Sequence, residues 1–153
     1  MRQGLVFGFA LALVASATVS AADLRKSGFE FMSPATQAMQ RDDSQNPAML
    51  WVKDGEALWN QQPDKGTKSC AACHGDAGKG MRGVAATYPA FDVAAKRPLN
   101  LAERINLCRK NKQQQTPWPP EHAALLALES YVALQSRGMP IAPWRDPRLT
   151  PFF

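Results

Sequence analysis

The stretch Cys70-Ala71-Ala72-Cys73-His74 decides how the rest of the chain folds. Two thiols separated by two residues and followed directly by an imidazole form the attachment pattern of a c-type haem. The thiols can bond to the two vinyl groups on one edge of a haem, and the imidazole can then bind the iron. Cys70 and Cys73 are therefore the candidate thioether residues, and His74 is the candidate proximal axial ligand.

Two other functions use a Cys-x-x-Cys pair, and the chain fits neither of them well. A structural zinc site needs four ligands, and besides the motif the chain offers only Cys108 and His122, which have no paired spacing. A thioredoxin-like disulfide lies near a βαβ pattern, whereas residues 66–69, with the sequence Gly-Thr-Lys-Ser, are typical of a loop. The pattern therefore favours a covalent haem c.

The first 22 residues predict a secretory signal peptide. Arg2 supplies a positive start, residues 3–22 carry no charge, and the sequence Val-Ser-Ala at 19–21 fits the small-x-small cleavage rule. A retained membrane anchor is the alternative, but the apolar run is shorter than the roughly 20 residues that span a bilayer. We therefore expect removal of residues 1–22, no stable membrane insertion, and export to the periplasm, where bacteria attach c-type haem.

The composition bounds the mature chain to one small domain. Removal of the signal from 153 residues leaves about 130. The full sequence contains 12 Pro and 10 Gly, which favour irregular structure over much of the chain. The net charge of +5 is scattered along the sequence. This excess is too small to predict nucleic-acid binding and is compatible at most with an acidic protein partner.

Helical patterns around the motif predict an all-α, class I cytochrome c-like domain around one covalent haem, at residues 46–138. Asn46 and Pro47 are a cap and a first helical residue for a helix whose apolar stripe reaches Trp59. Gly55 inside this helix costs about 1 kcal/mol relative to Ala. A glycine at this position favours a close approach by another part of the chain. An ordinary amphipathic helix that tolerates the glycine is the alternative, and the residues alone leave it open.

Two more helices are expected after the motif. Asn100 and Glu103 match a capping box, so the first helix starts there and runs to about residue 110. The second is expected from residue 121 to about residue 136, with Gly138 behind its last turn.

The other segments predict irregular structure. Residues 23–45 form a polar lead-in that contains a short helix near residues 33–40. Residues 75–83 contain four glycines and predict a loop along the haem edge. Residues 139–153 form a Pro-rich tail in which no packed element is expected.

The second axial ligand decides the chemistry of such a haem. His122, at the start of a helix, fits a solvated capping residue better than a ligand. Met81 follows His74 too closely to reach the other face of the ring easily, and Met139 lies later than the loop that usually supplies a ligand. The remaining methionine candidates are Met32, Met39 and Met49.

Cys108 is the strongest candidate for the distal ligand. It follows the motif by 34 residues and shares a predicted helix face with Leu101 and Ile105. A thiolate is favoured by the basic side chains nearby, which are Arg104, Arg109, Lys110 and Lys112. An inert buried thiol, or one that pairs with another chain, is the alternative, and the residues alone leave both open.

Several further runs resemble the SoxA family, the c-type cytochrome subunits of the thiosulfate-oxidising SoxAX complex. The resemblance covers about residues 55–140. Its runs are SCAACHG at 69–75, MRGVAA at 81–86, YPAFD at 88–92, RPLNL at 97–101, RINLCR at 104–109 and YVALQSRGMP at 131–140.

The resemblance implies a periplasmic complex that couples thiosulfate oxidatively to a cysteine of a SoxYZ-type carrier. Electrons leave through the haem of a SoxX-type cytochrome subunit. Family members have two cytochrome c-like domains, and the first haem, where present, is bound by a His and a Cys thiolate at positions that match His74 and Cys108. The second domain carries the catalytic haem.

The sequence departs from the family in one respect. No second Cys-x-x-Cys-His motif and no Cys after Cys108 occur, so the catalytic haem is expected to be absent from this chain. Residues 139–153 are then expected to be the start of an interrupted interdomain linker. No catalytic residue is assigned, and whether this chain is itself an enzyme stays open.

The predicted function is therefore electron transfer or structural support within a SoxAX-type complex. The first alternative is a free-standing monohaem electron carrier with Met ligation. An enzyme with an open haem site, and an inactive remnant of a longer protein, are further alternatives.

Overall fold

The computed structural model describes residues 26–141, 143 and 147–152. The predicted signal peptide lies outside these residues. The described elements, in chain order, are η1 (Gly28–Phe31), α1 (Pro34–Arg41), α2 (Ala48–Asn60), α3 (Cys70–His74), α4 (Ala77–Gly80), η2 (Ala85–Thr87), β1 (Ala90–Asp92), β2 (Arg97–Leu99), α5 (Leu101–Lys112), α6 (Ala123–Leu134) and η3 (Pro147–Phe152).

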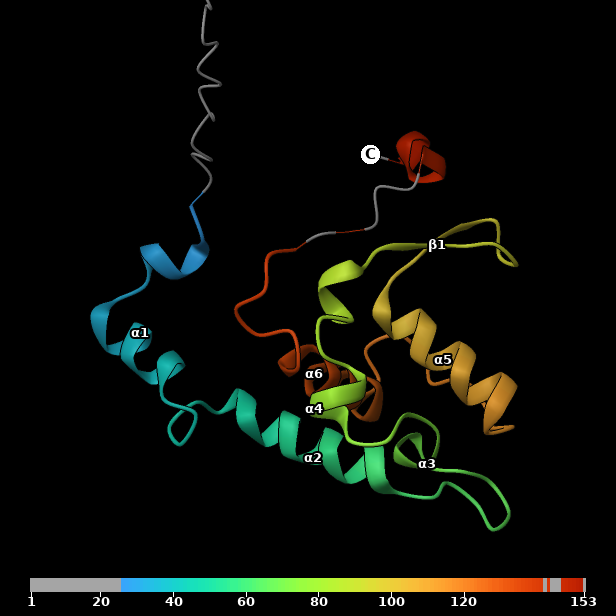
Figure 1. The fold of residues 1–153 in the computed structure, drawn as a ribbon. Helices are drawn as coiled ribbons and strands as arrows, with labels where there is room; N and C mark the ends of the chain where they lie inside the picture. Colours follow the sequence, from blue (N-terminus) through green and yellow to red (C-terminus); the bar gives the residue numbers. More distant parts are fainter. Residues whose placement is uncertain (1–25, 142, 144–146, 153) are drawn as a thin grey trace, which may run out of the picture.

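The pair α2 and α6 forms the largest helix–helix contact of the domain, and α5 packs on α6 from another side (Figure 1). Gly55 makes the first contact possible. A Cβ at this position would overlap the carbonyl oxygen of Ala127 and lie 2.7 Å from Cβ of Tyr131. The predicted close approach at Gly55 is therefore confirmed, and α6 is the element that approaches.

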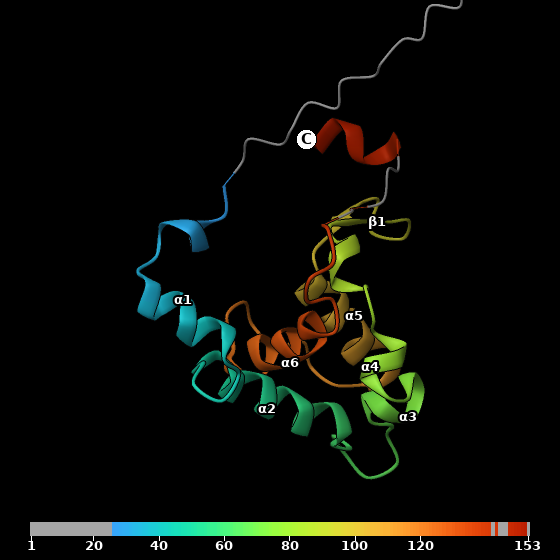
Figure 2. The same ribbon diagram turned by 60° about the vertical axis from the view of Figure 1, so that its left-hand side comes forward.

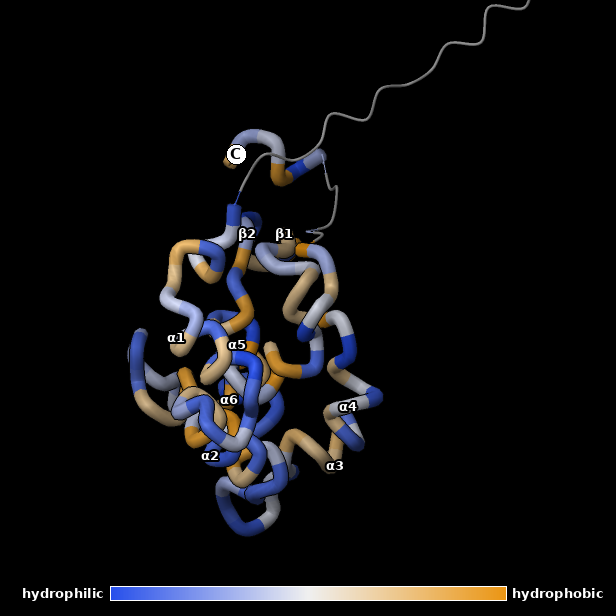
Figure 3. The backbone as a smooth tube through the Cα atoms, turned by 90° about the vertical axis from the view of Figure 1, so that its left-hand side faces the viewer, coloured by the Kyte–Doolittle hydropathy of each residue, from blue (hydrophilic) through white to orange (hydrophobic). Residues whose placement is uncertain are grey.

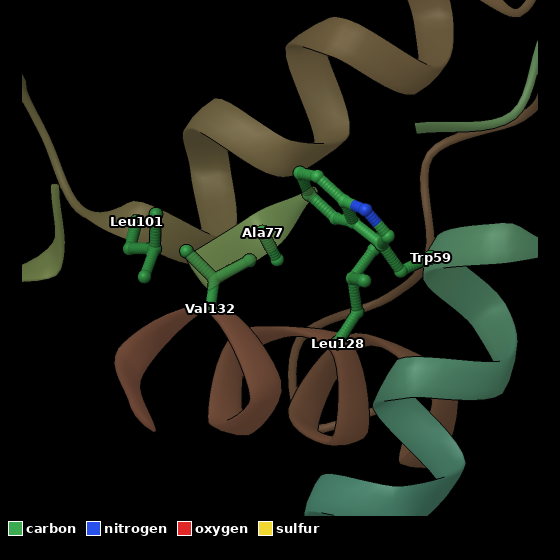
Figure 4. Close-up of a cluster of buried hydrophobic side chains, with 5 residues drawn as sticks. All are labelled: Trp59, Ala77, Leu101, Leu128 and Val132. Carbon is green, nitrogen blue, oxygen red and sulfur yellow. The ribbon is translucent and has the colours of Figure 1, made fainter. Parts of the chain in front are cut away.

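The core lies between these helices and the segment of the motif. Figure 4 shows the indole of Trp59 beside Leu128, with side chains from the starts of α4 and α5 nearby. Figure 3 shows hydrophobic stretches of α6 beside α2 in the middle of the molecule. The buried members of this cluster are Trp59, Ala77, Leu101, Leu128 and Val132.

The helix boundaries follow local signals. Asn100 and Glu103 form both hydrogen bonds of the capping box, at 2.8 and 2.9 Å, as predicted. Oδ1 of Asn46 accepts a hydrogen bond from the amide of Ala48 at 3.0 Å, but α2 begins one residue later than predicted, at residue 48 with Pro47 as its N-cap. The second predicted helix begins two residues late, because Glu121 has a left-handed φ of 61°.

The domain is mostly helical, as predicted, but it also contains two short strands. β1 and β2 pair antiparallel, with Ala90 opposite Leu99 and Asp92 opposite Arg97. The segment 75–83 also differs from the predicted loop. Oδ1 of Asp76 accepts a hydrogen bond from the amide of Lys79 and starts the helical turn α4.

The expectation that the tail has no packed element is wrong. η3 contacts both strands, and Leu149 within it is buried. The guanidinium of Arg148 lies over the ring of Phe91, 4.6 Å from its centroid. An apolar side chain and a cation–π contact therefore hold this Pro-rich segment on the hairpin.

At the other end, η1 and α1 extend away from the body of the domain (Figures 1 and 2). Neither element contains a buried residue. The ion pair of Asp43 with Arg137, at 2.9 Å, connects the loop after α1 to the segment after α6.

Candidate haem site

The motif residues lie on a helix of little more than one turn. Oγ of Ser69 accepts a hydrogen bond from the amide of Ala72 at 3.0 Å and starts α3. Gly75 ends it with a φ of 70°, a conformation that favours glycine. One helical turn between Cys70 and Cys73 puts both thiols on the same side of the helix, with His74 directly beyond them.

Trp59 and Gly80 both lie close to His74. The indole ring of Trp59 lies 5.7 Å from the imidazole, centroid to centroid, at an interplanar angle of 36°. Its Nε1–H donates a hydrogen bond to the carbonyl oxygen of Gly75 at 3.1 Å. A Cβ at Gly80 would run into the carbonyl oxygen of His74, so only glycine lets α4 pack this closely on α3.

One cavity brings the predicted site residues together. It encloses about 970 Å³, including space open to solvent, and it is lined by Cys70, Cys73, His74 and Cys108. Most of the remaining lining is apolar or aromatic. Those residues include Trp59, Met81, Val84, Tyr88, Leu101, Ile105, Leu128 and Val132.

Cys108 reaches this cavity from α5. Leu101 and Ile105 line it too, so the prediction that these three side chains share one helix face is confirmed. Cys73, His74 and Cys108 are exposed, whereas Cys70 is half-buried. α3 and α5 thus form two walls of the cavity. α3 contributes two thiols and an imidazole, and α5 contributes one thiol.

Burial raises the pKa of the Cys70 thiol, and charge on Cys108 raises it further. Two neighbours act in the opposite direction. Nε2 of Gln113 donates hydrogen bonds to Sγ of Cys70 at 3.8 Å and to the carbonyl oxygen of Lys68 at 2.9 Å, and the charge of Arg109 also favours the thiolate. The end of α5 therefore fixes the first cysteine of the motif.

Arg109 is held against Trp118 at the same end of the cavity. Its guanidinium lies 3.3 Å from the ring centroid, and burial lowers its pKa. Its Nη2 donates to the carbonyl oxygen of Thr116 at 3.2 Å, while the buried Nε has no hydrogen-bond partner among the described residues.

The other predicted ligand candidates are less well placed, with one exception. Met81 lines the cavity. His122 does not, because its Nδ1 accepts a hydrogen bond from the amide of Ala124 and its ring stacks on Trp118 at 5.8 Å. The prediction that His122 is a capping residue is confirmed. Met32, Met39, Met49 and Met139 are not among the lining residues.

The sequence does not assign Trp59 or Gln113 to the site, whereas Gly80 belongs to the glycine-containing segment expected along the haem edge. Trp59 ends the apolar stripe of its helix, and that stripe is the signal that the sequence offers for it. Gln113 falls in a polar segment of 113–120, and nothing in the residue order connects it to Cys70, 43 residues away.

The donor set fits a haem. Haem iron already has four ring nitrogens, so the protein needs to supply at most two axial ligands and a largely apolar enclosure. This cavity offers two thiols at attachment spacing, an imidazole beside them and a third thiol on α5. By contrast, no group of three or more His, Cys, Asp or Glu side chains in the described part of the chain is arranged to hold a metal ion by itself.

The helical fold and this cavity define a cytochrome c domain, a class whose haem is covalently attached. The comparison with known families specifies it further. Residues 54–141 match the SoxA/TsdA cytochrome c domain, and the chain belongs to that family.

Curated relatives agree with this assignment. The chain is 38% identical over 115 residues to the L-cysteine S-thiosulfotransferase subunit SoxA of Pseudaminobacter salicylatoxidans, an alignment that covers 75% of this chain and 40% of the relative. It is 34% identical to the subunit of the same name from Rhodovulum sulfidophilum, over 76% of this chain and 41% of the relative. A thiosulfate dehydrogenase of Thiomonas intermedia is 32% identical, over 74% and 38%.

A solved structure also matches. The crystal structure of SoxXA from P. pantotrophus superposes with a TM-score of 0.76 at 29% identity, over 82% of this chain and 47% of that chain. The present chain spans less than half the length of the relatives that it matches. In the described part of the chain, no helix has both the length and the apolar character needed to cross a membrane.

Proposed function

We propose that this domain binds one haem c, with Cys70 and Cys73 as the thioether residues, His74 as the proximal ligand and Cys108 as the distal ligand. The observation that carries the proposal is that these four side chains, of which Cys108 lies 34 residues after His74 in the sequence, line one largely apolar cavity. The matching family is itself a cytochrome c domain, which supports the covalent haem.

The bound haem would supply a one-electron redox couple. The residues of this chain have separate tasks around it. Cys70 and Cys73 would anchor the haem, His74 and Cys108 would bind its iron, and the apolar lining would pack against the ring. With both axial positions filled by protein, direct substrate chemistry is not expected here.

The role that follows is electron transfer or structural support in a SoxAX-type complex of the periplasm. A SoxX-type cytochrome subunit is the proposed partner, because the matching crystal structure is that of SoxXA. A SoxYZ-type sulfur carrier is proposed for the full system on the strength of the family resemblance. The predicted signal peptide at residues 1–22 would direct export.

The haem is tested by expressing the exported protein in cells that attach c-type haem. After denaturation, the polypeptide is expected to keep the pigment in a gel stained for haem, and its mass should increase by one haem. Replacing Cys70 and Cys73 by alanine should abolish the stain. A colourless band of unmodified mass from the unsubstituted protein would overturn the proposal.

The distal ligand is tested by Cys108→Ala. A thiolate stabilises ferric iron, so the substitution is expected to change the ferric spectrum and to raise the reduction potential. The alternative is a free-standing carrier with Met ligation, and Met81 favours it because its side chain lines the same cavity. In that case the ferric spectrum shows a weak far-red band that Cys108→Ala leaves intact and Met81→Leu removes.

A further inference from the structure

The orientation of the His74 ring has an unusual source. An axial imidazole is commonly held by a hydrogen bond from its second ring nitrogen to a carbonyl or carboxylate. Within the described residues, neither ring nitrogen of His74 takes part in a hydrogen bond or an ion pair. Among these residues, the aromatic ring that lies against this imidazole is that of Trp59.

Trp59 contacts His74 in two ways. Its ring lies against the imidazole at 5.7 Å, and its Nε1–H donates to the carbonyl oxygen of Gly75, the next residue in the chain. The ring therefore limits rotation of the imidazole, and the hydrogen bond limits movement of the backbone that carries it.

Trp59 is itself held rigidly. Its side chain is only 4% exposed, and its ring contacts Tyr131 at 6.1 Å on α6 and packs against Leu128 (Figure 4). The close contact of α2 with α6 at Gly55, one helical turn earlier, fixes the helix from which the indole projects. The packing of α2 on α6 thus fixes the position of the Trp59 indole, and the indole in turn limits the orientation of the His74 imidazole.

We propose that Trp59 is a positioning residue for the axial imidazole, with its ring setting the angle of His74 and its N–H fixing the chain behind it. The inference rests on the proposed function, since it takes His74 as an iron ligand. It adds that α2 and α6 control the plane of that ligand through Trp59.

The test uses the exported holoprotein with its covalent haem. Electron paramagnetic resonance of the ferric protein reports the orientation of the axial imidazole plane. Trp59→Leu removes both contacts and is expected to shift the principal g-values or to give a second low-spin species. Trp59→Phe keeps an aromatic ring beside His74, so it should restore a single species. Trp51→Leu is the matched control, because Trp51 is on the same helix but 43% exposed.

Unchanged g-values in a folded, haem-containing Trp59→Leu protein would overturn the inference. If this variant does not fold, a measurement on the unsubstituted protein decides. The indole N–H of Trp59 should exchange with deuterium at least about 100-fold more slowly than that of Trp51, because it is buried and bonded to Gly75. Similar exchange rates for the two indoles would also overturn it.

The same samples separate this inference from the proposed function. Absence of covalent haem from the unsubstituted protein refutes the proposed function. A stained band combined with g-values that Trp59 does not affect refutes only the role of Trp59.

Discussion

Replacing Gly55 by alanine would put a methyl group where α2 and α6 touch. The new Cβ would overlap the carbonyl oxygen of Ala127 and lie 2.7 Å from Cβ of Tyr131. The carbonyl of Ala127 is part of the helix backbone and cannot change its rotamer as a side chain can, so the two helices must move apart. We therefore expect the substitution to destabilise the folded domain.

The magnitude follows from two opposing effects. Overpacking a core costs about 1–3 kcal/mol, and contact with backbone favours the upper end of that range. Alanine recovers about 1 kcal/mol of helix propensity relative to glycine. The expected net loss is about 2 kcal/mol, which lowers the melting temperature of a domain of this size by about 8–16 °C.

Thermal unfolding of the holoprotein, followed by far-ultraviolet circular dichroism, measures this loss. Gly28→Ala is the matched control, because a Cβ at Gly28 meets nothing within 4 Å. The control is expected to melt with the unsubstituted protein. Equal melting temperatures for Gly55→Ala and Gly28→Ala would refute the reasoning, because the overlap would then be relieved at no cost.

Three more substitutions test packing and electrostatics within the domain. Gln113→Leu leaves the Lys68 carbonyl without its donor and should cost about 1–3 kcal/mol in urea unfolding. Burial raises the pKa of Glu129 above its ordinary 4.5. The stability of the native state therefore falls as the pH rises through that raised pKa. Glu129→Gln should raise the melting temperature at pH 7 but leave it unchanged below the ordinary pKa. Gly80→Ala should displace His74 and alter the ferric spectrum.

Each of these has a control and a contradicting outcome. Gln40→Leu, at an exposed position on α1, should leave urea unfolding unchanged, and equal losses from both glutamines would contradict the role of Gln113. For Glu129→Gln, the same effect at all pH values would show that charge is not the cause. For Gly80→Ala, a spectrum identical to that of Gly28→Ala would show that α4 can move without moving His74.

Features encoded within a few residues were predictable from the sequence. The capping box at Asn100 and Glu103 connects residues one helical turn apart, and it forms as expected. The glycine at position 55 is informative because its cost in a helix requires a compensating close contact. Spacing along α5 likewise predicted that Cys108, Leu101 and Ile105 share a face, and all three line the cavity.

Features that depend on distant partners were not predictable in this way. β1 and β2 have three residues each, one of them Pro98, so no alternation marks them as strands. η3 is stabilised by contacts with that hairpin rather than by its own sequence. The contact of Trp59 with His74 likewise depends on how α2 packs, which residue order alone does not specify.

The contact at Gly55 has a consequence for the order in which the protein can assemble. α2 and α6 are in contact in the fold but lie near opposite ends of the domain's sequence, with α3 between them. A polypeptide that emerges with its N-terminus first cannot close this contact until residue 134 has appeared. Throughout that interval the thiols of Cys70 and Cys73 lie on an incompletely folded chain, where they would be accessible for the proposed attachment of haem.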